Sequence, residues 1–207
     1  MRDAVLIEFD NDTRQAHFHL TPDDDCYYFV EFVKGAGFGP PGNNFINNLK
    51  KKPSKRGTWE WQHKLRAIEE AAITLRRELP KEWLSDATFV PIPPSKARDD
   101  PEYDDRMLQV LKKLGREVDV RELVIQTHSM DATHVSEQRH SIDTLVEIYE
   151  IQEDLVRPKP THIVIVDDMI TAGNHFRAMC RVLEQRFPQV PLSGVFLARR
   201  VLPEHND

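Results

Sequence analysis

The 207-residue sequence predicts an α/β fold with a mainly parallel sheet flanked by helices and a β-rich N-terminal elaboration. Two observations predict it. After about residue 60, stretches with strand periodicity alternate with stretches of helical periodicity, which is typical of a parallel sheet joined by crossover helices. Before residue 34, short runs of β-forming residues are separated by polar turns, which favours antiparallel strands. We therefore divide the chain into residues 1–57, the elaboration, and residues 58–207, an α/β domain.

The N-terminal part is expected to begin with a β-hairpin, because residues 5–9 and 15–20 alternate apolar and polar side chains around a turn at Asn11-Asp12. Residues 26–33 predict a third strand. Residues 34–58 hold five of the eight glycines and three prolines, and they predict a long irregular connection. Lysines and arginines are frequent from Lys50 to Arg56. That segment is either a solvated loop or a patch that contacts nucleic acid or a partner protein.

The helical part begins with an amphipathic stripe from Trp61 to Leu75, which predicts a helix to about Leu79. The remaining pattern predicts four strands, at residues 87–92, 123–126, 162–166 and 190–198, and three helices, at residues 107–114, 141–150 and 176–183. This alternation is the basis of the parallel-sheet prediction.

Composition and charge exclude several classes of protein. The net charge of −6 argues against a protein that coats nucleic acid in general. Cys26 and Cys180 have no metal-ligand or redox spacing and are expected to be reduced thiols. No apolar run is long enough to cross a membrane or to serve as a signal peptide. We expect a soluble, cytoplasmic protein without a membrane partner, whose oligomeric state, homo-oligomers included, is left open.

The most informative stretch is IVIVDDMITAGNHF, residues 163–176. An apolar strand leads directly into Asp167 and Asp168, although adjacent like charges repel each other. Carboxylates accept hydrogen bonds from hydroxyls, and the turn that follows, residues 171–175, opens a helix whose first N–H groups favour an anion. A ribose 5-phosphate offers both partners. The alternative is that Asp168 and Thr171 only cap the helix.

This stretch resembles the phosphoribosyl pyrophosphate (PRPP) signature of type I phosphoribosyltransferases, in the version found in orotate phosphoribosyltransferases. The resemblance implies the type I phosphoribosyltransferase fold. It also implies that Asp167 and Asp168 hold the ribose 2- and 3-hydroxyls, and thereby reach Mg²⁺ indirectly. The 5-phosphate would be bound by the turn formed by Thr171, Ala172, Gly173, Asn174 and His175. The family usually ends this turn with a hydroxyl residue, where this chain has Asn174 and His175.

A second stretch, FVPIPPSKAR at residues 89–98, is similar to the pyrophosphate loop of ComF-type phosphoribosyltransferases. By that resemblance Ser95, Lys96 and Arg98 bind pyrophosphate together with Mg²⁺, and Arg106 or Arg139 closes over it. Lys96, Arg98 and Asp168 would be the catalytic residues, with Asp168 or the acidic 99–105 loop as general base. That loop departs from the family, which is neutral or basic there, and the family's N-terminal zinc ribbon is missing.

Three functions fit these motifs. The first is an enzyme that binds PRPP or a nucleotide and transfers phosphoribosyl to an acceptor, which the sequence does not identify. The second is a catalytically silent protein that senses PRPP or a nucleotide. The third is an accessory protein in bacterial DNA uptake or phage defence, with the Lys50–Arg56 segment touching nucleic acid or a partner.

Overall fold

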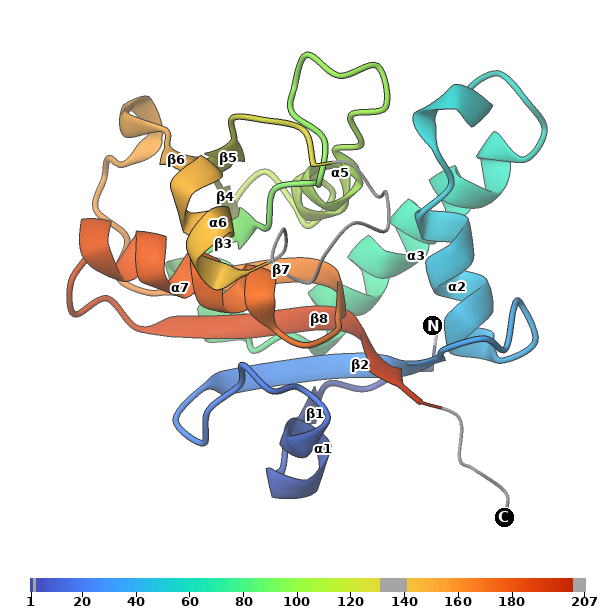
Figure 1. Ribbon diagram of the computed structural model, residues 1–207, viewed down its shortest axis with the longest axis horizontal. Helices are drawn as coiled ribbons and strands as arrows, with labels where there is room; N and C mark the ends of the chain where they lie inside the picture. Colours follow the sequence, from blue (N-terminus) through green and yellow to red (C-terminus); the bar gives the residue numbers. More distant parts are fainter. Residues whose placement is uncertain (2, 131–140, 203–207) are drawn as a thin grey trace.

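The protein folds around a six-stranded sheet with helices on both faces, as the computed structural model shows for residue 1, residues 3–130 and residues 141–202 (Figure 1). The strand order is β1-β2-β8-β7-β3-β4. Only β1 runs antiparallel to its neighbour. The prediction of a mainly parallel α/β sheet is thus confirmed. The strands are β1 (Ile7–Glu8), β2 (Asp25–Val33), β3 (Thr88–Pro91), β4 (Asp119–Val120), β7 (Ile163–Ile170) and β8 (Leu192–Val201).

A second, smaller sheet pairs β5 (Val124–Gln126) with β6 (Tyr149–Ile151) in antiparallel fashion. The strand predicted at residues 123–126 therefore exists but lies outside the central sheet. The helices are α1 (Asn11–Gln15), α2 (Pro41–Leu49), α3 (Trp61–Glu78), α4 (Lys81–Asp86), α5 (Arg106–Lys112), α6 (Ile142–Ile148) and α7 (Asn174–Arg186), with 3₁₀ turns η1 (Pro53–Lys55) and η3 (Glu153–Leu155).

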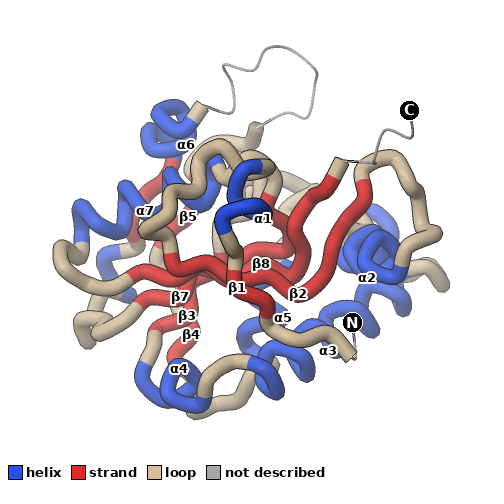
Figure 2. Tube along the Cα trace, turned by 90° about the horizontal axis from the view of Figure 1, so that it is seen from below, coloured by secondary structure: helices blue, strands red, loops and turns tan. Residues whose placement is uncertain are grey.

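Strand β7 lies inside the sheet and is buried on both faces. Successive side chains of a strand point to opposite faces, so Ile163 and Ile165 pack in the core beneath α6 and α7. Val164 and Val166 pack in the core beneath α3 and α5. Figure 2 shows these helix layers on either side of the strands. Each buried aliphatic side chain stabilises the fold by about 1.5–3 kcal/mol, so the end of β7 is held firmly in place.

The strand order reverses between β3 and β7. From β3 the chain passes through α5 to β4 on one side, and from β7 it passes through α7 to β8 on the other. The two crossover helices cover opposite faces of the sheet. In open parallel sheets this switch point leaves a crevice beyond the carboxyl ends of the strands, where ligands bind.

The prediction of an N-terminal β-hairpin is wrong. Residues 11–15 form helix α1, because the Asp10 side chain caps it by accepting a 2.8 Å hydrogen bond from the Thr13 amide. Strand β2 pairs in parallel with β8, so the first third of the chain has no antiparallel sheet of its own. The division at residue 57 stays a prediction, and the segments on either side of it share one sheet.

The prediction of an irregular connection at residues 34–58 is also wrong, because this segment contains α2 and η1. Pro41 starts α2, where its fixed φ suits a first helical turn. Gly42 lets the helix approach β2 closely, because an added Cβ would lie 2.1 Å from the Glu31 carbonyl oxygen. Phe45, Ile46 and Leu49 then bury the apolar face of α2. Within the described ranges, no helix combines the length and the apolar character that crossing a bilayer requires.

Candidate functional site

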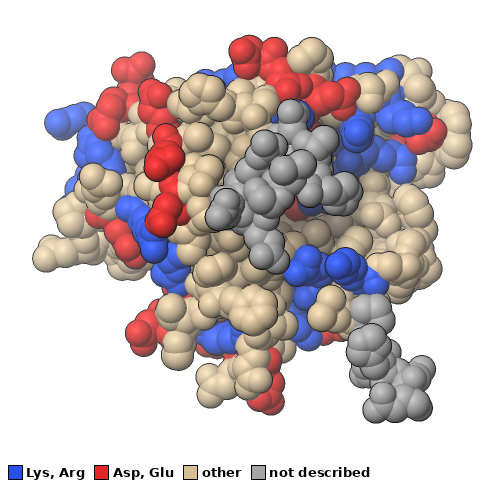
Figure 3. Space-filling view, in the orientation of Figure 1, with Lys and Arg blue, Asp and Glu red and all other residues tan. Residues whose placement is uncertain are grey.

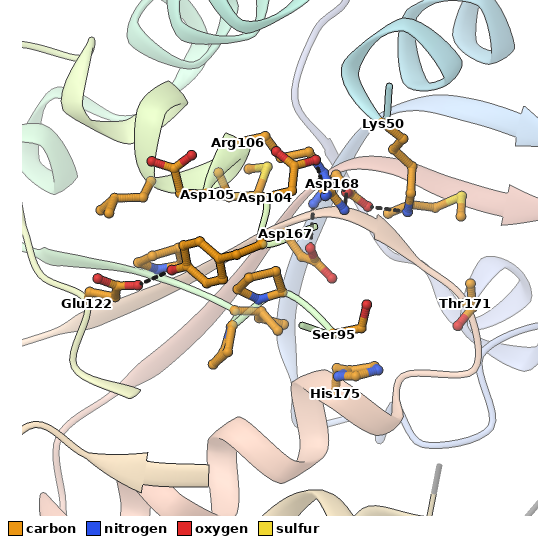
Figure 4. A pocket seen from close by; sticks show the side chains of 18 residues that line it. Lys50, Ser95, Asp104, Asp105, Arg106, Glu122, Asp167, Asp168, Thr171 and His175 are labelled. Carbon is orange, nitrogen blue, oxygen red and sulfur yellow. Dashed lines mark hydrogen bonds and ion pairs between the residues drawn. The ribbon is translucent and has the colours of Figure 1, made fainter. Parts of the chain in front are cut away.

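A cavity of about 210 Å³ lies at the switch point, beyond the carboxyl ends of β3 and β7 (Figure 4). The segment after β3, the start of α5, the end of β7 with its following turn, and the end of α2 contribute its walls. Its lining residues are Lys50, Pro91, Ile92, Pro93, Pro94, Ser95, Tyr103, Asp104, Asp105, Arg106, Met107, Leu108, Glu122, Asp167, Asp168, Met169, Thr171 and His175.

Asp168 is held by two cations on the face of the sheet that α3 and α5 cover. It is only 2% exposed. One carboxylate oxygen accepts a 3.0 Å hydrogen bond from Lys50 Nζ, and the other accepts from Arg106 Nε at 2.6 Å and also from Arg106 Nη2. Burial alone would raise the pKa of Asp168, but Arg106 and Lys50 outweigh it and hold the pKa well below its usual range. Asp168 is therefore a poor proton acceptor.

Asp167 differs from its neighbour in both direction and charge state. Adjacent side chains of a strand point to opposite faces of the sheet. The Asp167 side chain therefore points away from that of Asp168, toward the side of the cavity with Ser95 and His175 (Figure 4). Its Oδ1 accepts a 2.7 Å hydrogen bond from the Asp168 amide. Burial and the negative charge of Asp168 raise the pKa of Asp167 to about 7. Near neutral pH this carboxyl group can therefore both donate and accept a proton.

The cations that hold Asp168 belong to a longer charged network. Arg106 Nη1 also donates a 2.8 Å hydrogen bond to Asp104. Asp104 in turn accepts from Lys64 Nζ at 2.6 Å, and the Lys64 side chain has no exposed surface. Lys50, Asp168, Arg106, Asp104 and Lys64 thus form one chain of ion pairs, which we call the charged network. It connects α2, α3, β7 and the loop before α5.

The turn after β7 is shaped by Gly173, which has φ of +95° and precedes the first residue of α7. This left-handed conformation suits glycine. The N-terminal segment packs against the turn: the His17 ring contacts the Thr171 carbonyl oxygen, and the His19 amide donates a 3.0 Å hydrogen bond to the Ala172 carbonyl oxygen. The backbone that the sequence predicts to hold a phosphate is therefore fixed in shape before any ligand binds.

His175 and Thr171 are the two residues of this turn that line the cavity. Tyr149 Oη lies 2.8 Å from His175 Nδ1. Burial raises the pKa of Tyr149, so its hydroxyl stays protonated. Which of the two atoms donates depends on the tautomer of the His175 ring. Asn174 begins α7 beside His175, and neither Ala172, Gly173 nor Asn174 reaches the cavity wall.

The predicted pyrophosphate loop reaches the cavity only in part. Ser95 lines it, but Lys96 and Arg98 line a small neighbouring hollow and not the cavity itself. Lys96 lies 3.6 Å from Asp100, and Arg98 forms an ion pair with Glu122. Neither cation lies at the cavity as the sequence motif would place it. Arg106 does lie there. Arg139, the other predicted closing residue, lies outside the described residues.

The loop keeps this position because the segment after β5 holds it. Gln126 Nε2 donates a 2.8 Å hydrogen bond to the Ser95 carbonyl oxygen, and the Met130 amide donates to the same oxygen at 2.8 Å. The Ala97 amide donates to Ser129 Oγ, which in turn donates to Asp100. These contacts turn the basic side chains of the loop away from the cavity.

The basic side chains of the Lys50–Arg56 segment have different partners, and contact of this segment with nucleic acid or a partner protein stays a prediction. Lys50 faces the cavity through its ion pair with Asp168. Lys51 Nζ donates to Asn48, Lys55 forms an ion pair with Glu60, and Arg56 lies over the Trp61 ring. Figure 3 shows Lys and Arg side chains gathered over this segment, while Asp and Glu gather over the loop before α5. Sequence analysis missed Lys50 as a cavity residue because no local pattern distinguishes it from the lysines beside it.

Metal binding by protein groups alone has no support in the described part of the chain, where no three His, Cys, Asp or Glu side chains are placed to hold an ion. Three cavity carboxylates, Asp105, Glu122 and Asp167, have no ion pair with a cation of the charged network. One or two carboxylates together with ligand phosphates are a usual set of ligands for Mg²⁺. No protein-family model matches the chain, and no curated protein matches it.

Proposed function

We propose that the cavity binds a ribose 5-phosphate unit, as PRPP or as a nucleotide, and that the fold is of the type I phosphoribosyltransferase kind. The observation that carries the proposal is that Asp167 and two residues of the following turn, Thr171 and His175, line one cavity at the switch point. A carboxylate there accepts hydrogen bonds from ribose hydroxyls, and the positive end of the α7 dipole favours a phosphate. His175 lines the same cavity.

The chemistry that this arrangement supports is transfer of phosphoribosyl to an acceptor. In that reaction the bond from the anomeric carbon to pyrophosphate breaks, and a bond to the acceptor nucleophile forms. The protein contributes by orienting the ribose and by balancing the charge of the leaving pyrophosphate. Asp167, with its pKa near 7, is the cavity residue suited to accept the proton of the nucleophile. Mg²⁺, when bound, neutralises pyrophosphate charge.

A second candidate function is ligand binding without transfer. It is favoured by the ion pairs of Lys96 with Asp100 and of Arg98 with Glu122, which keep the two cations of the predicted pyrophosphate loop off the cavity. A protein that senses PRPP or a nucleotide needs the ribose and phosphate contacts but no loop that follows the leaving group. The two candidates differ in one measurement, the release of pyrophosphate from PRPP in the presence of free nucleobases.

The binding step, which both candidates share, is tested by calorimetric titration of the whole chain with PRPP, with and without Mg²⁺. Asp167→Asn should weaken binding about 10- to 100-fold, because it removes a charged acceptor that is worth about 1.5–3 kcal/mol. Asp154→Asn, at an exposed position in η3, is the matched control and should bind as the wild type does. Absence of PRPP binding by the wild type, or equal affinity of both variants, would contradict the proposal.

A further inference from the structure

We propose that Lys50 and Arg106 bind the pyrophosphate group of the ligand, and that the buried Lys64 positions Lys50 for this role. The inference rests on the proposed function and names a subsite within it. It assigns the pyrophosphate to the charged network instead of to Lys96 and Arg98. It also makes Asp168 a residue that orients these cations.

Lys50 and Arg106 are the two cations that line the cavity among the described residues. The Lys50 side chain is 38% exposed, and one hydrogen bond to Asp168 leaves further N–H groups of its ammonium for a ligand. Arg106 is 17% exposed and contacts Asp168 through Nε and Nη2. A guanidinium carries five N–H donors in a fixed plane, which matches phosphate oxygens. Both cations are thus held in place while part of each faces the cavity.

Lys64 explains why Lys50 is held at this place. Its ammonium donates three hydrogen bonds: to the Leu49 carbonyl oxygen at 2.9 Å, to the Lys51 carbonyl oxygen at 2.8 Å and to Asp104 at 2.6 Å. The two carbonyls stand on either side of Lys50. The backbone from which the Lys50 side chain extends is therefore tied to α3. A rigidly held cation loses less conformational entropy when it binds a ligand than a free surface lysine does.

The charge balance of the network also favours an anion. Three cations, Lys50, Lys64 and Arg106, share two carboxylates, Asp104 and Asp168. One positive charge is left over in a largely buried setting, where an unmatched charge is costly. Three further carboxylates, Asp105, Glu122 and Asp167, line the same cavity. Their negative charge means that pyrophosphate is expected to bind as its Mg²⁺ complex.

The predicted alternative, the loop after β3, has the opposite properties. Its cations line a different hollow and are occupied by Asp100 and Glu122. Moving them to the cavity would break these ion pairs and the hydrogen bonds that the Ser95 and Ala97 backbone makes with residues 126–130. Lys50 and Arg106 need no such rearrangement.

The experiment compares two probes by calorimetric titration of the whole chain, Mg²⁺-pyrophosphate and ribose 5-phosphate. Lys50→Gln should weaken Mg²⁺-pyrophosphate binding about 10- to 100-fold, the loss expected for a charged hydrogen bond, and change ribose 5-phosphate affinity less than about twofold. Lys52→Gln is the matched control, because Lys52 is exposed, lies two residues away and does not line the cavity. Lys96→Gln tests the alternative loop.

Lys64→Met tests the positioning role with the same two probes. If Lys64 positions Lys50, the variant loses pyrophosphate affinity and keeps ribose 5-phosphate affinity, a selectivity that general destabilisation would not produce. Circular dichroism at the titration temperature checks that it is folded. Equal pyrophosphate affinity of Lys50→Gln and Lys52→Gln, or a larger loss in Lys96→Gln, would overturn the assignment of pyrophosphate to Lys50 and Arg106. The proposed binding of ribose 5-phosphate would not be affected by either result. If the wild type binds neither probe nor PRPP, the proposed function fails with it.

Discussion

The adjacent acids Asp167 and Asp168 should respond in opposite ways to the same substitution. Asp168→Asn removes the buried charge that the half-buried Arg106 and the partly exposed Lys50 share. Removing one partner of a buried ion pair costs about 3–5 kcal/mol. Because Lys50 is partly exposed to water, we expect a loss at the lower end of that range, about 3 kcal/mol of the free energy of unfolding at pH 5. Asp167→Asn instead removes a carboxylate that no cation of the charged network contacts.

The effect of Asp167→Asn should depend on pH. The pKa of this carboxyl group is raised to about 7 in the folded protein, whereas an unfolded aspartate titrates near 3.9. The folded state therefore favours the neutral form, so the ionisable group costs stability as pH rises from about 4 to about 7. The cost levels off above pH 7. Between pH 5 and pH 8 the free energy of unfolding of Asp167→Asn relative to the wild type should rise by about 2–3 kcal/mol.

Urea denaturation followed by circular dichroism at pH 5, 6.5 and 8 measures both effects. Linear extrapolation gives the free energy of unfolding of the wild type and each variant. Our assignment of opposite environments to the two acids would be refuted by a pH-independent difference for Asp167→Asn. It would equally be refuted if the two variants had the same stability at pH 5. A gain in stability on losing Asp167 would also fit a residue kept for ligand binding.

Three further outcomes follow from the packing. Lys64→Met should lower the free energy of unfolding by about 3–5 kcal/mol in urea denaturation, because Asp104 and two carbonyls lose a buried partner. Gly42→Ala should lower the free energy of unfolding by about 1–3 kcal/mol, because the added Cβ would collide with the Glu31 carbonyl oxygen of β2. Gly39→Ala should lower it much less, because its Cβ would lie 3.6 Å from the nearest atom, the Ala36 carbonyl oxygen. Tyr149→Phe should cost about 1 kcal/mol through the lost hydrogen bond to His175, and it should weaken PRPP binding in calorimetry; unchanged affinity would separate Tyr149 from the site.

The elements that sequence analysis predicted well have strong local signals. The apolar stripe from Trp61 predicted α3, which runs from Trp61 to Glu78. The apolar run before Asp167 predicted β7, although the strand continues through both acids to Ile170. In both cases burial of one stripe or of both strand faces dictates the residue types directly. The motif around Asp167 predicted acids at the end of an apolar strand, and both acids lie near the carboxyl end of β7 and line the cavity.

The parts that sequence analysis missed depend on contacts between distant residues. Helix α2 reads as a loop because Gly42 and four asparagines favour turns, and it is the contact with β2 that stabilises the helix. The ion pair of Lys50 with Asp168 joins residues 118 positions apart, and no pattern near Lys50 announces it. The turn of Lys96 and Arg98 away from the cavity likewise depends on hydrogen bonds from residues 126–130, which local propensity does not encode.

The pairing of β2 with β8 has a consequence for how the chain is made. Asp25 and Ser193, whose side chains are hydrogen-bonded at the start of these strands, are 168 residues apart. At a synthesis rate of about 5–20 residues per second, β2 waits on the order of 10 to 30 seconds before its partner has been synthesised. During that time one edge of a strand rich in aromatic residues is unpaired and open to aggregation. The nascent protein should therefore depend on chaperones until its last strand emerges from the ribosome.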